Sequence, residues 1–280
     1  MRRVLLVLAL LAAALVLAPN ADAADGRRAL LIGINDYAGR TDDTVTAVGD
    51  VIDLRDLLLR EGWAPENVRV LTDGAATAQA IRDGLRWLGD TSTDASLSVF
   101  HWSGHVKQLG GDRDRDGEEL DEYLWSHDNV FLADLELRQW IDRVRGRTWV
   151  DIAGCEASGF DDGISGPNRL FTASSLEHEK SYEQPAWNNS VFTGLLVDQG
   201  MLQGRADLNG DGAVSIQEAF FVAADQAPHI TSRQSHGPQH PLAAGGGEQQ
   251  WYLGAGPAPT PPAAQETPAE RRCLVIFTCS

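Results

Sequence analysis

Apolar runs alternate with helix-spaced apolar positions along most of this 280-residue chain. Apolar runs that end in turn residues predict strands at 28–35, 67–73, 96–104, 148–154 and 168–175. Apolar positions at helical spacing predict helices at 45–62, 80–90, 132–146 and 216–227. Because strands and helices alternate, we expect an α/β fold with a mostly parallel sheet covered by helices on both faces.

Two reactive side chains follow strands of this predicted sheet. His105 comes after the run that ends in HWSG, and Cys155 comes after TWVDIAG. In parallel sheets, sites form at the edge where the carboxyl ends of the strands meet. An imidazole beside a thiol can hold it as a thiolate for attack on a carbonyl, so the pair predicts a cysteine hydrolase. The alternative for Cys155 is a buried small apolar residue.

The two ends of the chain differ in composition from the rest. Residues 1–23 combine an arginine pair, an apolar stretch and a small-residue cleavage site, which predicts an export signal and a secreted or periplasmic protein. The alternative is an uncleaved anchor, and no later segment is long enough to span a bilayer. Residues 255–280 are Pro/Ala-rich, typical of a linker, and end in a tail where Cys273 and Cys279 could form a disulfide. Residues 24–254 form the predicted catalytic domain.

The charge of the chain disfavours one class of partner. A formal net charge of −17 argues against nucleic acid, because phosphate backbones require cationic surfaces. An acidic surface suits calcium or a basic substrate. Lysine is rare while arginine and alanine are common, which favours a bacterial protein from a GC-rich genome. We expect a monomer.

Several ordered motifs resemble the caspase-like cysteine peptidases, and metacaspases more than animal caspases. They are the segments ALLIGINDY, AVGDVIDLRDLL, NVRVLTDGAAT, SGH, LDEYLWSHDN and GCEASG. In caspases, too, the histidine lies about fifty residues before the cysteine. The resemblance implies a caspase-like three-layer sandwich, with Cys155 as nucleophile and His105 as general acid and base. The backbone N–H groups of Cys155 and Val106 are the expected oxyanion donors.

Two positions depart from the family's pattern. Val106 stands where the family usually has glycine, beside the approaching substrate carbonyl. Ala153 replaces one of the two acidic residues with which metacaspases bind a basic side chain at the cleavage position. The other acidic position matches Asp50, so the resemblance implies cleavage after Arg, or Lys, with Asp50 pairing the substrate cation. The alternative for Asp50 is a solvated carboxylate on a helix.

A calcium-binding loop is predicted downstream, at 207–218. The segment DLNGDGAVSIQE matches the twelve-residue EF-hand pattern, with Gly212 at the sharp turn and a predicted helix after it. A plain acidic turn is the alternative. The expected Ca²⁺ ligands are Asp207, Asn209, Asp211, the Ala213 carbonyl, Ser215 and Glu218.

A second calcium site is implied by the resemblance alone. Metacaspases use an aspartate in the LDEY-like segment, one that opens the next helix, and one shortly after the cysteine. These positions match Asp121, Asp134 and Asp162, so activation by calcium is expected. The preceding acidic run at 112–117 repeats only the first half of an EF-hand loop, and a solvated loop is its alternative.

Two functions of different classes fit these features. One is an exported, calcium-assisted cysteine endopeptidase that acts on peptides with a basic residue at the cleavage position. The other is a catalytically silent calcium-binding interaction module with the same fold. Val106 and Ala153 favour the silent module, whereas the retention of both His105 and Cys155 favours the enzyme, which is the function we predict.

Overall fold

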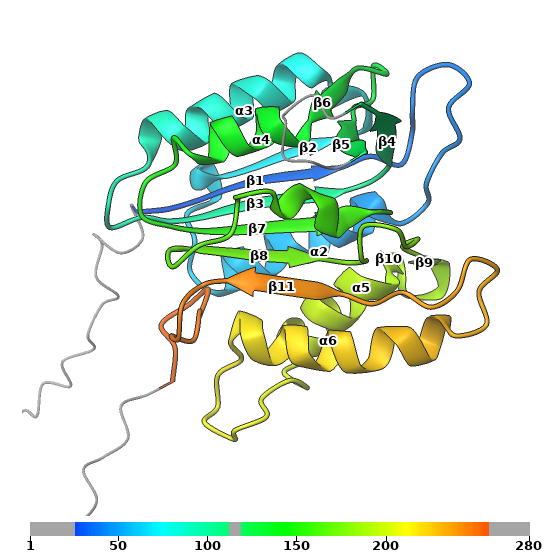
Figure 1. Ribbon diagram of the computed structural model, residues 1–280. Coiled ribbons are helices and arrows are strands. Elements are labelled where there is room, and N and C mark those ends of the chain that lie inside the picture. Colours follow the sequence, from blue (N-terminus) through cyan, green and yellow to red (C-terminus); the bar gives the residue numbers. More distant parts are fainter. Residues whose placement is uncertain (1–25, 112–118, 258–280) are drawn as a thin grey trace, which may run out of the picture.

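The computed structural model describes residues 26–111 and 119–257, and its centre is a six-stranded sheet (Figure 1). The strand order is β11-β8-β7-β3-β1-β2, and every neighbouring pair is parallel except β11 with β8. The predicted mostly parallel α/β fold is therefore confirmed. The strands are β1 (Arg27–Gly33), β2 (Val68–Thr72), β3 (Leu97–Ser103), β7 (Arg147–Ala153), β8 (Arg169–Ala173) and β11 (Leu242–Gly245).

Helices cover both faces of this sheet (Figure 1). The side chains of β1 alternate between two cores: Leu30 and Ile32 pack with α3 and α4, and Leu31 packs with α2, η5 and α6. The helices are α2 (Ala47–Arg60), α3 (Ala78–Thr91), α4 (Asp134–Ile141), α5 (Val191–Thr193), the π-helix η5 (Gly194–Leu202) and α6 (Ile216–Thr231). The predicted helices at 45–62, 80–90, 132–146 and 216–227 correspond to α2, α3, α4 and α6.

A second, antiparallel sheet was not predicted from the sequence. Its order is β4-β5-β6, with β4 (Val106–Gly110), β5 (Leu120–Trp125) and β6 (Phe131–Ala133). The strands are short, and the buried positions of β5 include Asp121 and Glu122, so the usual alternation of apolar and polar residues is missing. Because β4 begins directly after His105, this sheet positions the predicted catalytic histidine.

Short elements complete the described chain. The helix η5 was also missed, because it is apolar and buried on most sides and has no amphipathic repeat. The remaining short elements are η1 (Pro65–Asn67), η2 (Asp73–Ala75), η3 (Ala157–Asp161), η4 (Pro185–Trp187), β9 (Glu183–Gln184) and β10 (Asn189–Ser190).

The predicted leader at 1–23 and most of the predicted linker and tail lie outside the described residues. The acidic run at 112–117 and the cysteine pair near the end of the chain lie outside them too. Within the described ranges, no helix combines the length and the apolar character needed to cross a membrane. Trp251 is fully buried in the core beside α6, so the folded unit reaches at least that residue.

Candidate functional site

A cavity of about 130 Å³ lies at the carboxyl ends of β3 and β7. The two strands pair in register, with Ser103 opposite Ala153, so the segments that follow them emerge side by side. Both predicted catalytic residues, His105 and Cys155, line this cavity. The start of α2 and residues 181–190 contribute the other walls. The fold thus brings together two side chains that the sequence placed at the ends of separate strands.

The His105 ring is held by residues from the loop after β1. Its backbone N–H donates to the Tyr37 hydroxyl at 2.7 Å, and the centroids of the two rings lie 4.8 Å apart. Nε2 of His105 lies 2.8 Å from the Asp42 carbonyl oxygen. A carbonyl oxygen can only accept a hydrogen bond, so Nε2 carries the proton and Nδ1 is the basic nitrogen of the neutral ring.

The loop that carries Cys155 is fixed by two serines that follow β8. The Ser174 hydroxyl accepts from the Gly154 N–H at 3.0 Å and donates to the Gly154 carbonyl at 2.8 Å. The Ser175 hydroxyl donates to the same carbonyl at 3.0 Å. Glu156 has a φ of +52°, in the left-handed region, and this turns the chain away directly after the cysteine. The nucleophile is therefore preceded by a hydrogen-bonded residue and followed by a sharp turn.

The Cys155 thiol is protonated in these surroundings. Burial raises its pKa, and the charge of Glu156 acts in the same direction, whereas the backbone of Ser181 and the charge of Lys180 act against the rise. Sγ lies 4.0 Å from the Ser181 carbonyl oxygen. Lys180 is paired with the Glu156 carboxylate, which limits its effect on the thiol. The thiol needs a base to ionise.

Val106 does not obstruct its own backbone N–H. It lies opposite Leu124 in the β4–β5 pair, and the Trp125 N–H donates to the His105 carbonyl at 3.2 Å in the neighbouring pair. Val106 is therefore in a non-hydrogen-bonded pair, and its N–H points away from β5. Its side chain is buried against the cysteine loop, where a Cβ added to Gly154 would lie 2.8 Å from Val106 Cγ2.

Asp50 lies behind the cavity floor and does not itself line the cavity. It is fully buried, and its carboxylate accepts from the Ser103 hydroxyl at 2.7 Å and the Ser190 N–H at 2.9 Å. Both serines line the cavity. Burial raises the pKa of Asp50 to about 6, and the hydrogen bond from Ser103 and the charge of His101 oppose that rise. The alternative of a solvated helix carboxylate is therefore wrong.

One wall of the cavity is tied to two distant segments. The Glu183 carboxylate accepts from the N–H groups of Val45 and Thr46, at 2.7 and 2.8 Å, just before α2 begins. On the other side, the Tyr182 N–H donates to the Gln239 side chain at 3.1 Å. Gln239 lies in the loop that follows α6, so both α2 and α6 contribute to the position of this wall.

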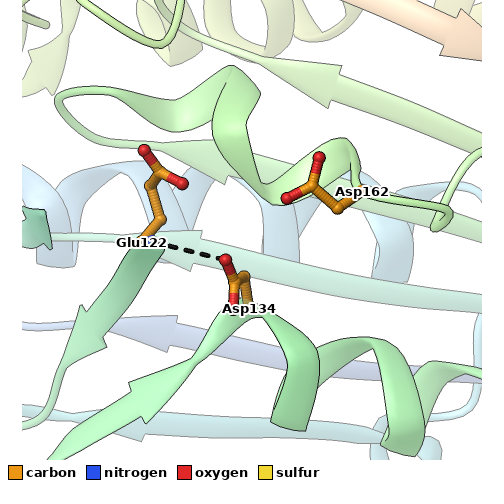
Figure 2. A group of neighbouring side chains, drawn as sticks. All are labelled: Glu122, Asp134 and Asp162. Carbon is orange, nitrogen blue, oxygen red and sulfur yellow. Dashed lines mark hydrogen bonds between the residues drawn. The ribbon is translucent and has the colours of Figure 1, made fainter. Parts of the chain in front are cut away.

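Three acidic side chains from distant segments form a compact group. They are Glu122 on β5, Asp134 at the start of α4 and Asp162 just after η3, and one ligand atom of each lies within 4.8 Å of the others. Figure 2 shows the three and the hydrogen bond from the Glu122 N–H to Asp134 Oδ2, at 3.3 Å. The prediction named Asp121 in place of Glu122. Asp121 points to the opposite face of β5, where its Oδ2 accepts from the Tyr123 hydroxyl at 3.3 Å.

The predicted EF-hand loop at 207–218 is closed by hydrogen bonds to its own backbone. The Asp207 carboxylate accepts from three loop N–H groups at 2.8 to 3.1 Å. Glu218 accepts from the Ser215 N–H at 3.0 Å, which together with the Ser215 hydroxyl forms a capping box at the start of α6. Gly212 has a φ of +86°, the turn that the pattern requires. Within the described residues, no other acidic group is as compact as that of Glu122, Asp134 and Asp162.

Sequence reasoning did not assign several residues that contact the candidate site. Ser103 had a usable signal, because it is a polar residue at the end of a buried strand. Ser190, Tyr37 and Asp42 had none, since they lie far from His105 and Cys155 in the chain and meet them only through the fold.

Comparisons with known proteins found a family model and several relatives that match parts of this chain. A family model described as the caspase domain matches residues 26–201. Metacaspase-1 of Schizosaccharomyces pombe is 36% identical over 104 residues, which are 35% of this chain and 24% of that protein. Metacaspase-3 of Arabidopsis thaliana is 31% identical over 102 residues, which are 34% of this chain and 27% of that protein. The chain thus spans about a quarter of the length of these relatives.

A solved structure supports the same fold. The crystal structure of a protein from Geobacter sulfurreducens matches with a TM-score of 0.59 at 17% sequence identity. The match covers 78% of this chain and 93% of that one. At this identity the likeness concerns the fold alone.

Proposed function

Because the chain belongs to the caspase family of cysteine peptidases, we propose that it is an endopeptidase in which Cys155 attacks the substrate and His105 transfers the proton. The observation that carries this proposal is the shared cavity, which both side chains line from the ends of adjacent, in-register strands. The hydrogen bond between His105 Nε2 and the Asp42 carbonyl also supports it, because it leaves Nδ1 as the proton acceptor.

The proposed reaction begins with transfer of the Cys155 thiol proton to Nδ1 of His105, while sulfur attacks the scissile carbonyl carbon. A C–S bond forms, and the carbonyl π pair moves to oxygen, where the N–H groups of Cys155 and Val106 stabilise it. The imidazolium then gives the Nδ1 proton to the leaving amine as the C–N bond breaks. Water, deprotonated by His105, hydrolyses the thioester and restores the thiol.

The proposed substrate is a peptide with Arg, or Lys, at the cleavage position. Asp50 supplies the negative charge beneath the cavity floor, and Ser103, which donates to Asp50, can accept from a substrate guanidinium with its remaining lone pairs. The contact with the cation is thus relayed by Ser103, whereas the sequence suggested a direct pair. Glu183 also lines the cavity, but its carboxylate already accepts from the N–H groups of Val45 and Thr46.

Calcium assistance is proposed through Glu122, Asp134 and Asp162. Ionised carboxylates this close repel one another, and their oxygens are the donors that Ca²⁺ prefers, so the donor set fits the ion. Bound there, the ion supplies positive charge that joins β5 and α4 to the segment after η3. Because η3 begins two residues after Cys155, that segment continues directly from the nucleophile loop.

A second calcium ion is proposed in the loop at 207–218. Its pattern and the turn at Gly212 support binding by the six ligands named from the sequence. The helix α6 starts in this loop and leads to Gln239, which holds Tyr182 in the cavity wall. We propose that this ion stabilises the wall and leaves the chemistry to the residues of the cavity.

Export by residues 1–23 completes the proposal, with a monomeric enzyme acting in the periplasm or outside a bacterial cell. The support is the leader-like composition of that segment. Comparison of the mass of the protein recovered from cells with that of the full translated chain tests it.

A catalytically silent calcium-binding module is the second candidate. Two observations favour it: burial raises the pKa of the Cys155 thiol, and the cavity lacks an acidic side chain at Ala153.

Fluorogenic peptides with Arg, Lys or Asp at the cleavage position distinguish the two candidates. They are tested with calcium and with a chelator, on the protein and on its Cys155→Ala variant. The enzyme predicts calcium-dependent cleavage after Arg that disappears in the variant. Absence of cleavage of any peptide, in protein that still binds calcium, would establish the silent module.

A further inference from the structure

A chain of buried polar side chains crosses the sheet beneath the cavity floor. His101 on β3 is directly opposite Asp151 on β7, which is directly opposite Thr172 on β8. His101 Nδ1 lies 2.7 Å from Asp151 Oδ2, and the Thr172 hydroxyl donates to Asp151 Oδ1. Trp149 Nε1 donates to Thr172 Oγ1 at 2.8 Å. All four side chains are fully buried.

The residues of this buried polar group differ in how fully they are hydrogen-bonded. Asp151 has a hydrogen-bond partner on both carboxylate oxygens, and these hold it in one orientation. His101 Nε2 is buried and has no hydrogen-bond partner in the part of the chain that the structure describes. A buried nitrogen without a partner is costly unless a nearby charge compensates it. A charge on His101 acts on Asp50 and lowers the pKa of that carboxyl.

The strand geometry connects His101 and Asp151 to the cavity. Side chains alternate along β3, so His101 and Ser103 point to the same face, and Ser103 donates to Asp50 at 2.7 Å. Along β7 the same alternation puts Asp151 on the face of Ala153, two residues deeper than the cavity lining. Asp50 and the buried His101–Asp151 pair therefore both adjoin the same face of the sheet, behind the floor of the cavity.

We propose that His101, held as an imidazolium by Asp151, is the buried cation that keeps Asp50 ionised and thereby sets the preference of the cavity for a basic side chain. The proposal rests on the proposed cleavage after Arg. His101 and Asp151 are positioning residues, because they act on the substrate through Asp50. With His101 charged, the three groups carry a net charge of one negative unit, which a substrate guanidinium neutralises.

The other charged groups around Asp50 do not replace His101. On α2 itself, Asp53 lies one turn further on and accepts from the Asn189 side chain at 2.9 Å. On β9, Glu183 is engaged by the backbone before α2. Among the described residues, β10 brings only polar uncharged groups to Asp50, through Ser190. His101 is thus the cation whose charge acts on Asp50.

The test compares peptides that end in arginine or in citrulline, its neutral isostere, at the cleavage position. Measured on the calcium-loaded protein from pH 5 to 8, the ratio of kcat/KM for the arginine peptide to that for the citrulline peptide should have an acid limb, because loss of the basic His105 affects both peptides and protonation of Asp50 affects only the first. In His101→Gln this limb should move up by about one pH unit, so the arginine-to-citrulline ratio at pH 6.5 should fall roughly 3-fold. Asp151→Asn should move the acid limb and lower the arginine-to-citrulline ratio in the same direction, but by a smaller amount.

Asp53→Asn is the matched control, because it removes a carboxylate from the same helix and should change neither the limb nor the ratio. Wild-type preference for arginine with an unchanged ratio and limb in His101→Gln would overturn the proposal. Activity on no peptide would instead remove the proposed function.

A second measurement does not depend on the stability of His101→Gln or on activity. In full-length Cys155→Ala protein labelled with ¹⁵N-histidine, NMR of the ring nitrogens reports the protonation state of His101 directly. Both nitrogens should carry protons at pH 7. A neutral His101 ring would overturn the proposal.

Discussion

The two acidic regions proposed to bind calcium are built in opposite ways. The loop at 207–218 is a run of consecutive residues whose carboxylates already accept from their own backbone. The group of Glu122, Asp134 and Asp162 is assembled from three distant segments, and it is held by the sheet and by α4. A local motif carries its own geometry, whereas a dispersed site exists only once the chain has folded. Ion binding at a dispersed site therefore depends on the folded structure, and it can link segments that flank a nucleophile.

The largest expected effect separates Glu122 from Asp121. Glu122→Gln should weaken calcium activation of peptide cleavage by at least about 10-fold, because a ligand carboxylate is lost. Asp121→Asn, a change of the same charge on the neighbouring residue, should leave activation unchanged, because that side chain points to the other face of β5. The measurement is the calcium concentration that gives half-maximal activity. Loss of activation in Asp121→Asn with retention in Glu122→Gln would reverse the assignment.

Asp50, a fully buried carboxylate, differs from the exposed acids of the loop in how it makes stability depend on pH. Burial raises its pKa in the folded protein from 3.8 to about 6. The folded state then binds more protons than the unfolded state between these values, so this group lowers the free energy of unfolding as pH rises through the window. Relative to Asp50→Asn, the free energy of unfolding should fall by about 2 kcal/mol between pH 4 and 6.

Chemical denaturation of both proteins across that range measures the difference. Because other carboxyl groups titrate equally in the two proteins, the comparison isolates Asp50. A difference that is flat with pH would show that burial does not raise the pKa of Asp50 in the folded protein.

The smallest expected effects belong to the exposed loop. Calcium at about 100 times its Kd should stabilise the folded protein by about 2.7 kcal/mol through this site. Asp211→Asn should remove most of that gain and leave kcat at saturating calcium within about 2-fold, because the loop acts on the cavity wall only through α6. Glu218→Gln should also cost stability without calcium, since Glu218 caps α6. Thermal unfolding with calcium and with chelator tests both variants, and a loss of kcat in Asp211→Asn would show that the loop controls the chemistry.

The same contrast explains what the sequence could predict about the fold. The buried strands β1, β3 and β7 and the helix α2 were predicted, because their apolar runs or repeats are local signals. The second sheet was missed because β5 buries acidic side chains, which removes the apolar pattern of a strand. Its edge strand β4 directly follows the predicted histidine, so this omission concerned the site as well.

The candidate site divides in the same way. His105 and Cys155 were predicted because each follows a buried strand, and adjacent strands bring their ends together. The choice between Asp121 and Glu122 depends on which face of β5 each side chain takes, and both are acidic, so residue type could not decide it. The contacts of Tyr37 and Asp42 with His105 come from a loop that no local signal connects to the histidine.

Active-site labelling tests the central claim most directly. The calcium-loaded protein is incubated with a peptidyl chloromethyl ketone that ends in arginine, and the intact and digested masses are measured. One adduct per chain, on Cys155, absent in His105→Ala and slowed by an excess of the arginine peptide, is the predicted result. No adduct, or an adduct that forms equally well without His105, would contradict the account of a cysteine peptidase at this cavity.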